Sequence, residues 1–328
     1  MAVAQDSYPA SLATAICREP AGVAAAGSIR PPDGSTNSIT AIFNYVSADV
    51  ADADREAAQA ENFEVRFYQE LKNLRAWSAR ANWKQTSVPS FQVFVSTEYK
   101  ISKALVHVWA GHPGRMEFPV RRVISGTAAI AHELAHVLFP NGNRFLAEGL
   151  AVYLQAAIGG NPAFPNFGRS LYQQSRELLQ EMIPGFSVGN PKSLEQLHLS
   201  ELDEIATPCP LTLRVGKDFC GEEPRGQARI YSIVGSFVQF LVETRGHEKF
   251  NALYEQTPLV PFAQNVGAPD RWRSVYDVSL LGLEKEWKAM IVSDDASTFG
   301  KDSVGRRRRP GATVKSQHLD CNRENGNA

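Results

Sequence analysis

The sequence that decides the fold reads Ala131-His-Glu-Leu-Ala-His136, and Ala147-Glu-Gly-Leu-Ala151 follows it. Apolar residues recur at helical spacing in the first stretch, so Thr127 to Leu138 is predicted to be a helix with one buried face. Residues four apart share a face of a helix, so the imidazoles of His132 and His136 can reach one cation. Two imidazoles in this arrangement predict a metal site.

A catalytic Zn²⁺ takes nitrogen and oxygen ligands, needs three of them from the protein, and keeps one position open for water. Residues 140–143 end the first helix, and Asn143 can cap a second helix that closes at Gly159. Glu148 lies in the second turn of that helix, in an apolar stretch where a carboxylate is costly to bury unless a partner such as a metal ion compensates for it. We therefore expect one Zn²⁺ held by His132, His136 and Glu148; the alternative is a helix with two surface or capped histidines.

These residues resemble the gluzincin metallopeptidases, and most closely the bacterial peptidase MA-like domains, in which a His-Glu-x-x-His helix precedes a Glu-Gly-Leu-Ala helix. The resemblance covers about residues 38–292 and is strongest inside the motif. It implies an α+β, zincin-like fold, with a mixed N-terminal sheet and active-site helix followed by a mainly helical C-terminal lobe. It also implies that His132, His136 and Glu148 are the ligands and that Glu133 is the general base.

The resemblance implies hydrolysis of peptide bonds by a metal-activated water. Related enzymes supply an oxyanion donor from the C-terminal lobe, and Tyr231 is the candidate here because it is expected to open a helix after a loop; the alternative is a packing role for this residue. Some gluzincins carry an Asp four residues after the third ligand, which orients a histidine. Val152 stands at that position, so the support for the histidine must come from elsewhere.

Two functional hypotheses from different classes remain. The first is a zinc metallopeptidase, a hydrolase acting on peptide or protein substrates. The second is a catalytically inactive, zinc-stabilised domain that binds peptides or proteins through the same cleft, and the retention of Glu133 favours the first. No Gly-x-Met-Glu-Asn type run for amine recognition precedes the metal helix, which favours an endopeptidase over an aminopeptidase. The resemblance implies that an edge strand pairs with the substrate backbone, and this edge is one of the last two predicted strands, Leu105–Ala110 or Met116–Val120.

The composition is that of an ordinary globular protein. The 328 residues are 43% hydrophobic and 21% charged, with a formal net charge of −1. This balance gives no sign of a nucleic acid or an anionic membrane as partner. No stretch approaches the ~18 apolar residues of a membrane-spanning helix.

The compartment and the cysteine chemistry stay open. The N-terminus lacks the pattern of a signal peptide, which indicates a cytoplasmic protein if the start is native, whereas proteins of the resembling family are often exported. Cys209 and Cys220 bracket a short segment and form either a local disulfide or two reduced thiols. The other histidines are predicted to be structural or solvated, as is the four-arginine run in the tail: His107, His112, His198, His247, His318 and Arg306 to Arg309.

We expect a weakly ordered arm over residues 1–37, a peptidase domain over 38–292 with lobes of about 38–140 and 141–292, and a disordered tail over 293–328. Strands are predicted at Ile39–Val46, Phe91–Val95, Leu105–Ala110 and Met116–Val120. Beyond the metal site, helices are predicted at Asp52–Trp83, Ser170–Met182, within Ser193–Ile205, at Ala228–Thr244, ended by Gly246, and at Leu281–Met290. A surface loop is predicted at Pro208–Gly226.

Overall fold

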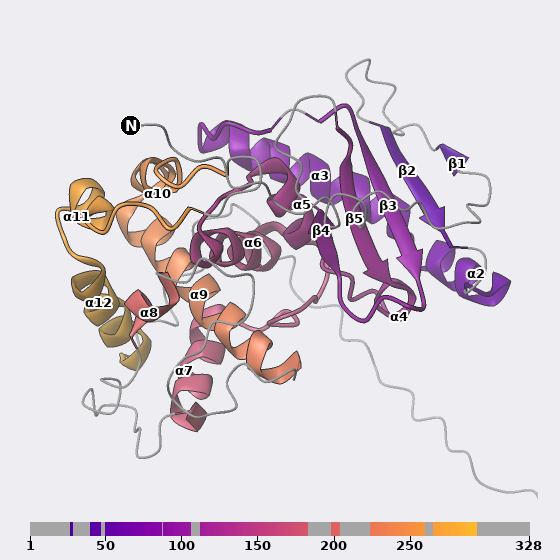
Figure 1. Ribbon diagram of the computed structural model, residues 1–328. Coiled ribbons are helices and arrows are strands. Elements are labelled where there is room, and N and C mark those ends of the chain that lie inside the picture. The colour runs from indigo at the N-terminus through magenta and orange to yellow at the C-terminus, as the bar shows by residue number, and fades with distance from the viewer. Residues whose placement is uncertain are drawn as a thin grey trace, which may run out of the picture.

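A mixed β-sheet occupies one end of the molecule (Figure 1). The computed structural model describes residues 27–28, 40–46, 50–86, 88–105, 112–182, 198–203, 224–259 and 265–293. Within them the strand order is β1-β2-β3-β5-β4; β2, β3 and β5 run parallel, while β1 and β4 pair antiparallel and form the two edges. The strands are β1 (Gly27–Ser28), β2 (Thr40–Tyr45), β3 (Ser90–Ser96), β4 (Lys103–Leu105) and β5 (Gly114–Pro119).

Aromatic side chains join one face of the sheet to a long helix. The N-terminal half contains the helices α2 (Asp52–Ala60), α3 (Phe63–Arg80) and α4 (Val120–Ile124). The ring of Phe43 on β2 packs edge-on against Phe63 and Phe67 of α3, with centroids 5.9 and 5.4 Å apart. Phe63 also meets Phe118 of β5 at 5.5 Å. Side chains alternate across a strand, so every second residue of β2, β3 and β5 faces this layer, including Phe43, Phe91 and Phe118.

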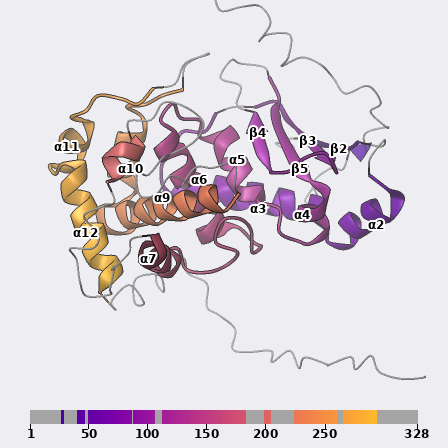
Figure 2. The ribbon, with the colours of Figure 1, turned by 60° about the horizontal axis from the view of Figure 1, so that its bottom comes forward.

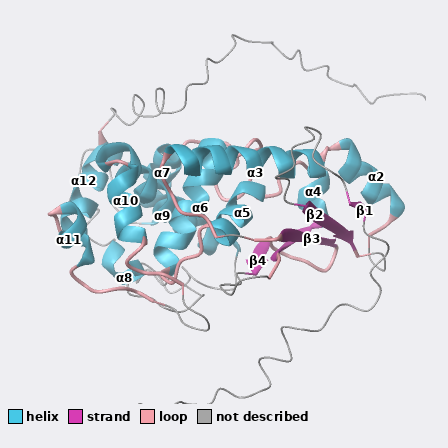
Figure 3. Ribbon diagram, turned by 90° about the horizontal axis from the view of Figure 1, so that it is seen from above, coloured by secondary structure: helices cyan, strands magenta, loops and turns pink. Residues whose placement is uncertain are grey.

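In the rest of the described chain the regular elements are helices, joined by loops (Figure 3). The helices are α5 (Ile130–Leu138), α6 (Arg144–Ile158), α7 (Leu171–Met182), α8 (Leu199–Asp203), α9 (Pro224–Arg245), α10 (His247–Tyr254), α11 (Arg271–Tyr276) and α12 (Leu280–Val292). Helix α6 is buried along most of its length and packs against α5 and α9 (Figure 2). It therefore connects the sheet half of the molecule to the C-terminal helices.

Two glycines allow α6 and α9 to approach closely. A Cβ atom at Gly149 of α6 would lie 2.5 Å from Val238 Cγ2 and 3.0 Å from the carbonyl oxygen of Val234 on α9. A Cβ atom at Gly235 of α9 would lie 2.3 Å from Val152 Cγ1 on α6. Real contacts of this kind are longer, so the packing of these two helices requires glycine at both positions.

Several sequence predictions are confirmed. The mixture of helices with a sheet agrees with the α+β class. The strands predicted around β2 and β3 are present, as are the helices predicted around α5, α7, α9 and α12. Asn143 caps α6, which ends at Ile158 before Gly159. Gly246, with φ of 88°, follows the last residue of α9.

The long helix predicted over Asp52–Trp83 is wrong, because two helices occupy this segment. Helix α2 ends at Ala60 and α3 starts at Phe63. Asn62 between them has φ of 52°, in the left-handed region that ends a helix and that Asn adopts more readily than most residues. The change of direction brings Phe63 to the sheet, where it is fully buried.

Other boundaries also differ. The strand predicted at Leu105–Ala110 overlaps β4 only at Leu105, since β4 begins at Lys103 and residues 106–111 lie outside the described residues. The strand predicted at Met116–Val120 starts two residues earlier and ends at Pro119, because Val120 begins α4. Helix α5 starts at Ile130, three residues later than predicted. The short helices α4, α10 and α11 were not predicted.

Several predicted features lie outside the described residues. These include all four cysteines, His107, His318 and the four-arginine run. Of the predicted N-terminal arm, the described part is Gly27–Ser28, which pairs with β2. His247 is half-buried, with its ring 5.6 Å from that of Trp77, rather than at the surface. Among the described helices, none combines the length and the apolar character needed to cross a bilayer.

Candidate metal centre

Helix α5 carries the two histidines, and a side chain from α6 fixes its first turn. No side chain caps α5 at its N-cap residue, Ala129. Instead, the side-chain oxygen of Gln155 accepts a hydrogen bond of 3.1 Å from the backbone N–H of His132. The amide nitrogen of Gln155 lies 3.3 Å from the side-chain oxygen of Asn161, which orients it. The first turn of α5 is thus bound to the helix that carries Glu148.

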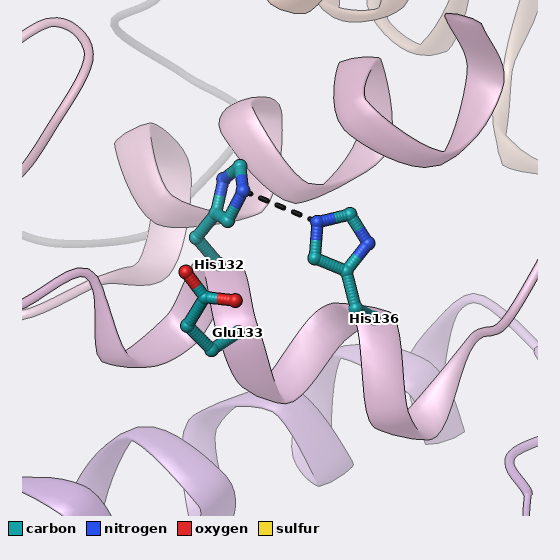
Figure 4. Close-up of side chains that lie close together, drawn as sticks. All are labelled: His132, Glu133 and His136. Atoms are coloured by element: carbon teal, nitrogen blue, oxygen red, sulfur yellow. Dashed lines mark hydrogen bonds between the residues drawn. The ribbon is translucent and has the colours of Figure 1, made fainter. Parts of the chain in front are cut away.

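The imidazoles of His132 and His136 face the same side of α5 (Figure 4). Their Nε2 atoms are 3.2 Å apart, and the ring planes make an angle of 82°. The apolar residues predicted to form the opposite face, Ile130, Leu134 and Leu138, are all buried. The four-residue spacing therefore brings two nitrogen atoms to one point.

The carboxylate of Glu148 reaches the histidine pair from α6. The side chain of Asn143 begins this helix by accepting a 3.0 Å hydrogen bond from the N–H of Leu146. Glu148 in the next turn is 1% exposed. Its Oε2 atom lies 3.2 Å from Nε2 of His132 and 3.4 Å from Nε2 of His136. Three possible ligand atoms from two helices thus face one another.

Arg144 holds the other oxygen of Glu148. Its Nη2 atom lies 2.6 Å from Oε1, one helical turn away on α6. Burial alone would raise the pKa of Glu148, but the charge of Arg144 and the two imidazoles outweigh it and keep the pKa well below its usual range. Glu148 is therefore an anion with one oxygen directed at Arg144 and the other at the histidines.

Glu133 lies beside His132 in a buried position (Figure 4). A carboxylate oxygen of Glu133 and a ring nitrogen from each histidine lie within 4.8 Å of one another, so this group could also hold a metal ion. The Glu148 oxygen is nearer to both rings. Burial raises the pKa of Glu133 to about 7, and the charge of Glu148 adds to this, while His132, Arg144 and the backbone amide of Ala104 on β4 oppose it.

Tyr231 forms a wall of the same site. Its ring stacks on that of His132, with centroids 6.0 Å apart and planes at 22°. Its hydroxyl accepts a 3.1 Å hydrogen bond from Nη2 of Arg144. Phe164, in the segment after α6, packs against the far edge of the tyrosine ring. Tyr231 does not open a helix as predicted, because α9 begins at Pro224 and Tyr231 lies about two turns further along it.

Two polar atoms at the centre have no hydrogen-bond partner among the described residues. They are Oε2 of Glu148 and Nδ1 of His132, and both are buried. An unpaired buried polar atom costs roughly 1–3 kcal/mol. Val152 stands where an Asp would orient a histidine, so another acceptor was expected. No such acceptor is found for Nδ1 of His132 within the described chain. The unpaired Glu148 oxygen is directed at the point where the two imidazoles meet.

Sequence reasoning found five of the side chains at this site and missed others. The structure brings His132, Glu133, His136 and Glu148 together, with Tyr231 next to them. Arg144 was missed, although its four-residue spacing from Glu148 was a usable signal. The role of Gln155 had no local signal, because its partner lies 23 residues earlier in the sequence.

Comparison of the sequence with models of known protein families finds no match, and comparison with curated proteins finds none either. The interpretation of the site therefore depends on its own side chains. Their geometry brings two nitrogens and a carboxylate oxygen together around one point, with a second buried carboxylate beside them. Such a set can bind a divalent cation or transfer protons.

Proposed function

We propose that this chain is a zinc-dependent peptidase, with a gluzincin-like active site on a zincin-like fold. The three converging donor atoms carry the proposal: Nε2 of His132, Nε2 of His136 and Oε2 of Glu148 are separated by 3.2, 3.2 and 3.4 Å. Tetrahedral bonds of about 2.0–2.1 Å place neighbouring ligand atoms about 3.3–3.4 Å apart. These separations fit one Zn²⁺ with a fourth position left for water.

The unpaired atoms of the centre support the same conclusion. Glu148 Oε2 is buried and makes no hydrogen bond of good geometry among the described residues, and its nearest partners are the two imidazoles, so a cation between these groups would compensate the cost of burying the carboxylate. Two imidazoles and one carboxylate are also a common ligand set of catalytic zinc. When bound, the ion would polarise the substrate carbonyl and lower the pKa of a coordinated water to about 7.

In this proposal Glu133 is the general base. It is adjacent to His132 in the sequence and faces the same centre. Burial raises its pKa to about 7 in the metal-free site, and a carboxylate at this position can accept a proton from water and return one to the leaving amine. Both transfers need only the small displacements available to one side chain.

Tyr231 is proposed as the donor to the oxyanion. Its stacking on His132 brings the hydroxyl into the centre, where Arg144 donates to it. Burial is the main reason that its pKa is raised, and the hydroxyl therefore keeps the proton that an oxyanion donor needs. A packing role alone would require only the ring contacts with His132 and Phe164.

The edge strand β4 is the proposed binding place for the substrate backbone. β4 is the last strand of the described sheet and pairs only with β5 among the described strands. The amide of Ala104 on β4 favours the ionised form of Glu133, so this edge lies beside the catalytic centre. An extended peptide that adds to such an edge gains backbone hydrogen bonds without a requirement for one side chain. This arrangement suits an endopeptidase.

One observation favours the alternative of an inactive, zinc-stabilised binding domain. Nδ1 of His132 has no acceptor in the described residues, and histidine ligands of zinc usually donate this N–H to an oxygen. A centre without this support binds the ion less tightly. The retention of a buried Glu133 beside the site argues for catalysis. An experiment is needed to decide between the peptidase and the binding domain.

The test combines metal analysis of the purified protein with digestion of a peptide library that includes N-terminally blocked peptides. We expect one equivalent of zinc and cleavage of blocked peptides. Glu133→Gln should retain the zinc but lose cleavage by at least about 10²-fold, since it removes the proton acceptor. Glu56→Gln, an exposed residue of α2, is the matched control and should behave like the wild type.

The outcomes separate the hypotheses. Zinc without any cleavage by the wild type would favour the binding domain. Absence of bound zinc, together with failure to take up added zinc, would overturn both. Equal cleavage by the wild type and Glu133→Gln would remove Glu133 from the mechanism.

A further inference from the structure

Arg144 stands where a cation is electrostatically unfavourable. It is the first residue of α6, directly after the N-cap Asn143. The N-terminus of a helix carries partial positive charge, and a cation there typically costs about 0.3–1 kcal/mol. An arginine that precedes its glutamate by four residues is also the less favourable order of a helical ion pair. The helix itself therefore gains little from this residue, so its contacts must explain its presence.

The contacts of Arg144 give the two oxygens of the Glu148 carboxylate different partners. Nη2 of Arg144 is 2.6 Å from Oε1 of Glu148 and 3.1 Å from the hydroxyl of Tyr231. Oε2 is left without a hydrogen bond among the described residues and faces the imidazoles of His132 and His136. The Arg144 side chain is 34% exposed, whereas that of Glu148 is 1% exposed.

Packing alone does not fix which way the carboxylate turns. The backbone of Glu148 is fixed by the close contacts of α6 with α5 and α9. The last torsion of a glutamate side chain is broad and roughly two-fold, so the carboxylate rotates easily unless a partner holds it. A freely rotating carboxylate can bind a cation through both oxygens and so fill the position needed for water.

We propose that Arg144 is a positioning residue that restricts Glu148 to binding the metal ion through Oε2 alone. This inference depends on the proposed metal centre and assigns to it a residue outside the ligand set. By holding Oε1, the guanidinium leaves a single oxygen for the ion and keeps the fourth position open. Removal of Arg144 frees the carboxylate and allows two-oxygen binding.

The experiment uses the full-length protein with Co²⁺ in place of Zn²⁺, because the visible absorption of Co²⁺ reports its coordination number. The variants are Arg144→Met, which removes the charge and the donors, and Arg144→Lys, which keeps both. We expect the Met variant to show weaker visible bands, as for a five-coordinate ion, and the Lys variant to retain the wild-type spectrum. Arg169→Met, which removes an arginine from an exposed ion pair with Glu177, is the control.

The zinc affinity, measured by competition with a chelating dye, is the second measurement. An increase and a decrease in this affinity have different causes. Loss of a positive charge beside the ion would by itself tighten zinc binding. Loss of a residue that orients a metal ligand typically weakens binding by about 10–100-fold. We expect Arg144→Met to bind zinc more weakly than the wild type, because the loss of positioning outweighs the loss of charge. Arg144→Lys should bind zinc with an affinity closer to that of the wild type.

The proposal fails if Arg144→Met has the wild-type Co²⁺ spectrum, or if it binds zinc as tightly as the wild type or more tightly. Circular dichroism of the metal-free proteins checks that the variants are folded; if the Met variant is unfolded, the Lys variant decides, and an altered spectrum there overturns the proposal. If the wild type itself binds neither ion, the metal centre fails, and the role of Arg144 fails with it.

Discussion

Glu70 is a buried acid beside α5, and it takes no part in the proposed chemistry. It lies on α3 and is 1% exposed. Its Oε1 atom accepts a 3.3 Å hydrogen bond from the N–H of Gly160, and the backbone amide of Ala131 at the start of α5 also favours its charge. Burial nevertheless dominates and raises its pKa from 4.5 to about 7.

This shift predicts a pH dependence of stability. A carboxyl whose folded pKa lies above its unfolded value binds protons more strongly in the folded state, so its contribution to the free energy of unfolding falls as the pH rises from about 4.5 to about 7. Relative to Glu70→Gln, we expect the wild type to lose up to roughly 3 kcal/mol across this range. Urea unfolding with a chelator present measures both proteins without metal release. An unchanged difference between them at all pH values would contradict the prediction.

At the scale of single residues, the spacing rules of a helix were sufficient for the histidine pair and for Glu148. They were not sufficient for Glu70 and Gln155, which support α5. Glu70 lies 61 residues before its partner, the backbone amide of Ala131, and Gln155 lies 23 residues after its partner, the backbone amide of His132. Such contacts depend on how α3 and α6 pack, and a polar side chain carries no sign of its distant partner. Supporting residues are therefore harder to predict than ligands.

At the scale of elements, the contact between α6 and α9 controls the site, because Glu148 is on one helix and Tyr231 is on the other. Gly149→Val would drive new methyl groups into Val238 and the backbone of Val234. Overpacking of this kind typically costs about 1–3 kcal/mol, measured by chemical denaturation. Ala156→Val, on the exposed side of the same helix, should cost less than about 1 kcal/mol. Equal stability of the two variants would show that the helices can separate without cost.

Element types were easier to predict than their ends. Apolar periodicity identified α3, α5, α7, α9 and α12. The division between α2 and α3 was missed because neither Gly nor Pro interrupts the segment, and only the left-handed conformation of Asn62 marks the break. Helix α9 begins earlier than predicted, at Pro224, a residue that suits the first turn of a helix.

At the scale of the whole molecule, the order of the strands lies beyond a reading of the sequence. β5 pairs with both β3 and β4, so the strand that comes later in the chain is the inner one. Strand order depends on pairing between distant segments, and local patterns do not contain it. The sequence therefore left open which of the last two strands is the edge, and the structure places β4 there.

A ligand that binds only the folded state stabilises the whole molecule. We expect removal of zinc by a chelator to lower the thermal midpoint by about 5–10 °C, which corresponds to about 2.7 kcal/mol for zinc at 100 times its dissociation constant. Glu148→Ala should respond much less, whereas His198→Ala, an exposed histidine, should respond like the wild type. Equal responses of all three proteins would show that the chelator acts elsewhere.

The donors on α5 and α6 are close in the chain, since His136 and Glu148 are 12 residues apart. The ring that a captured ion would close is short, so the entropic cost of closing it is small. Tyr231 and the amide of Ala104 come from remote segments and join only when the tertiary structure is complete. Under the proposed function, binding of the ion and catalysis therefore depend on contacts at different sequence distances, and a chain with a misplaced α9 is expected to bind zinc without hydrolysing a peptide.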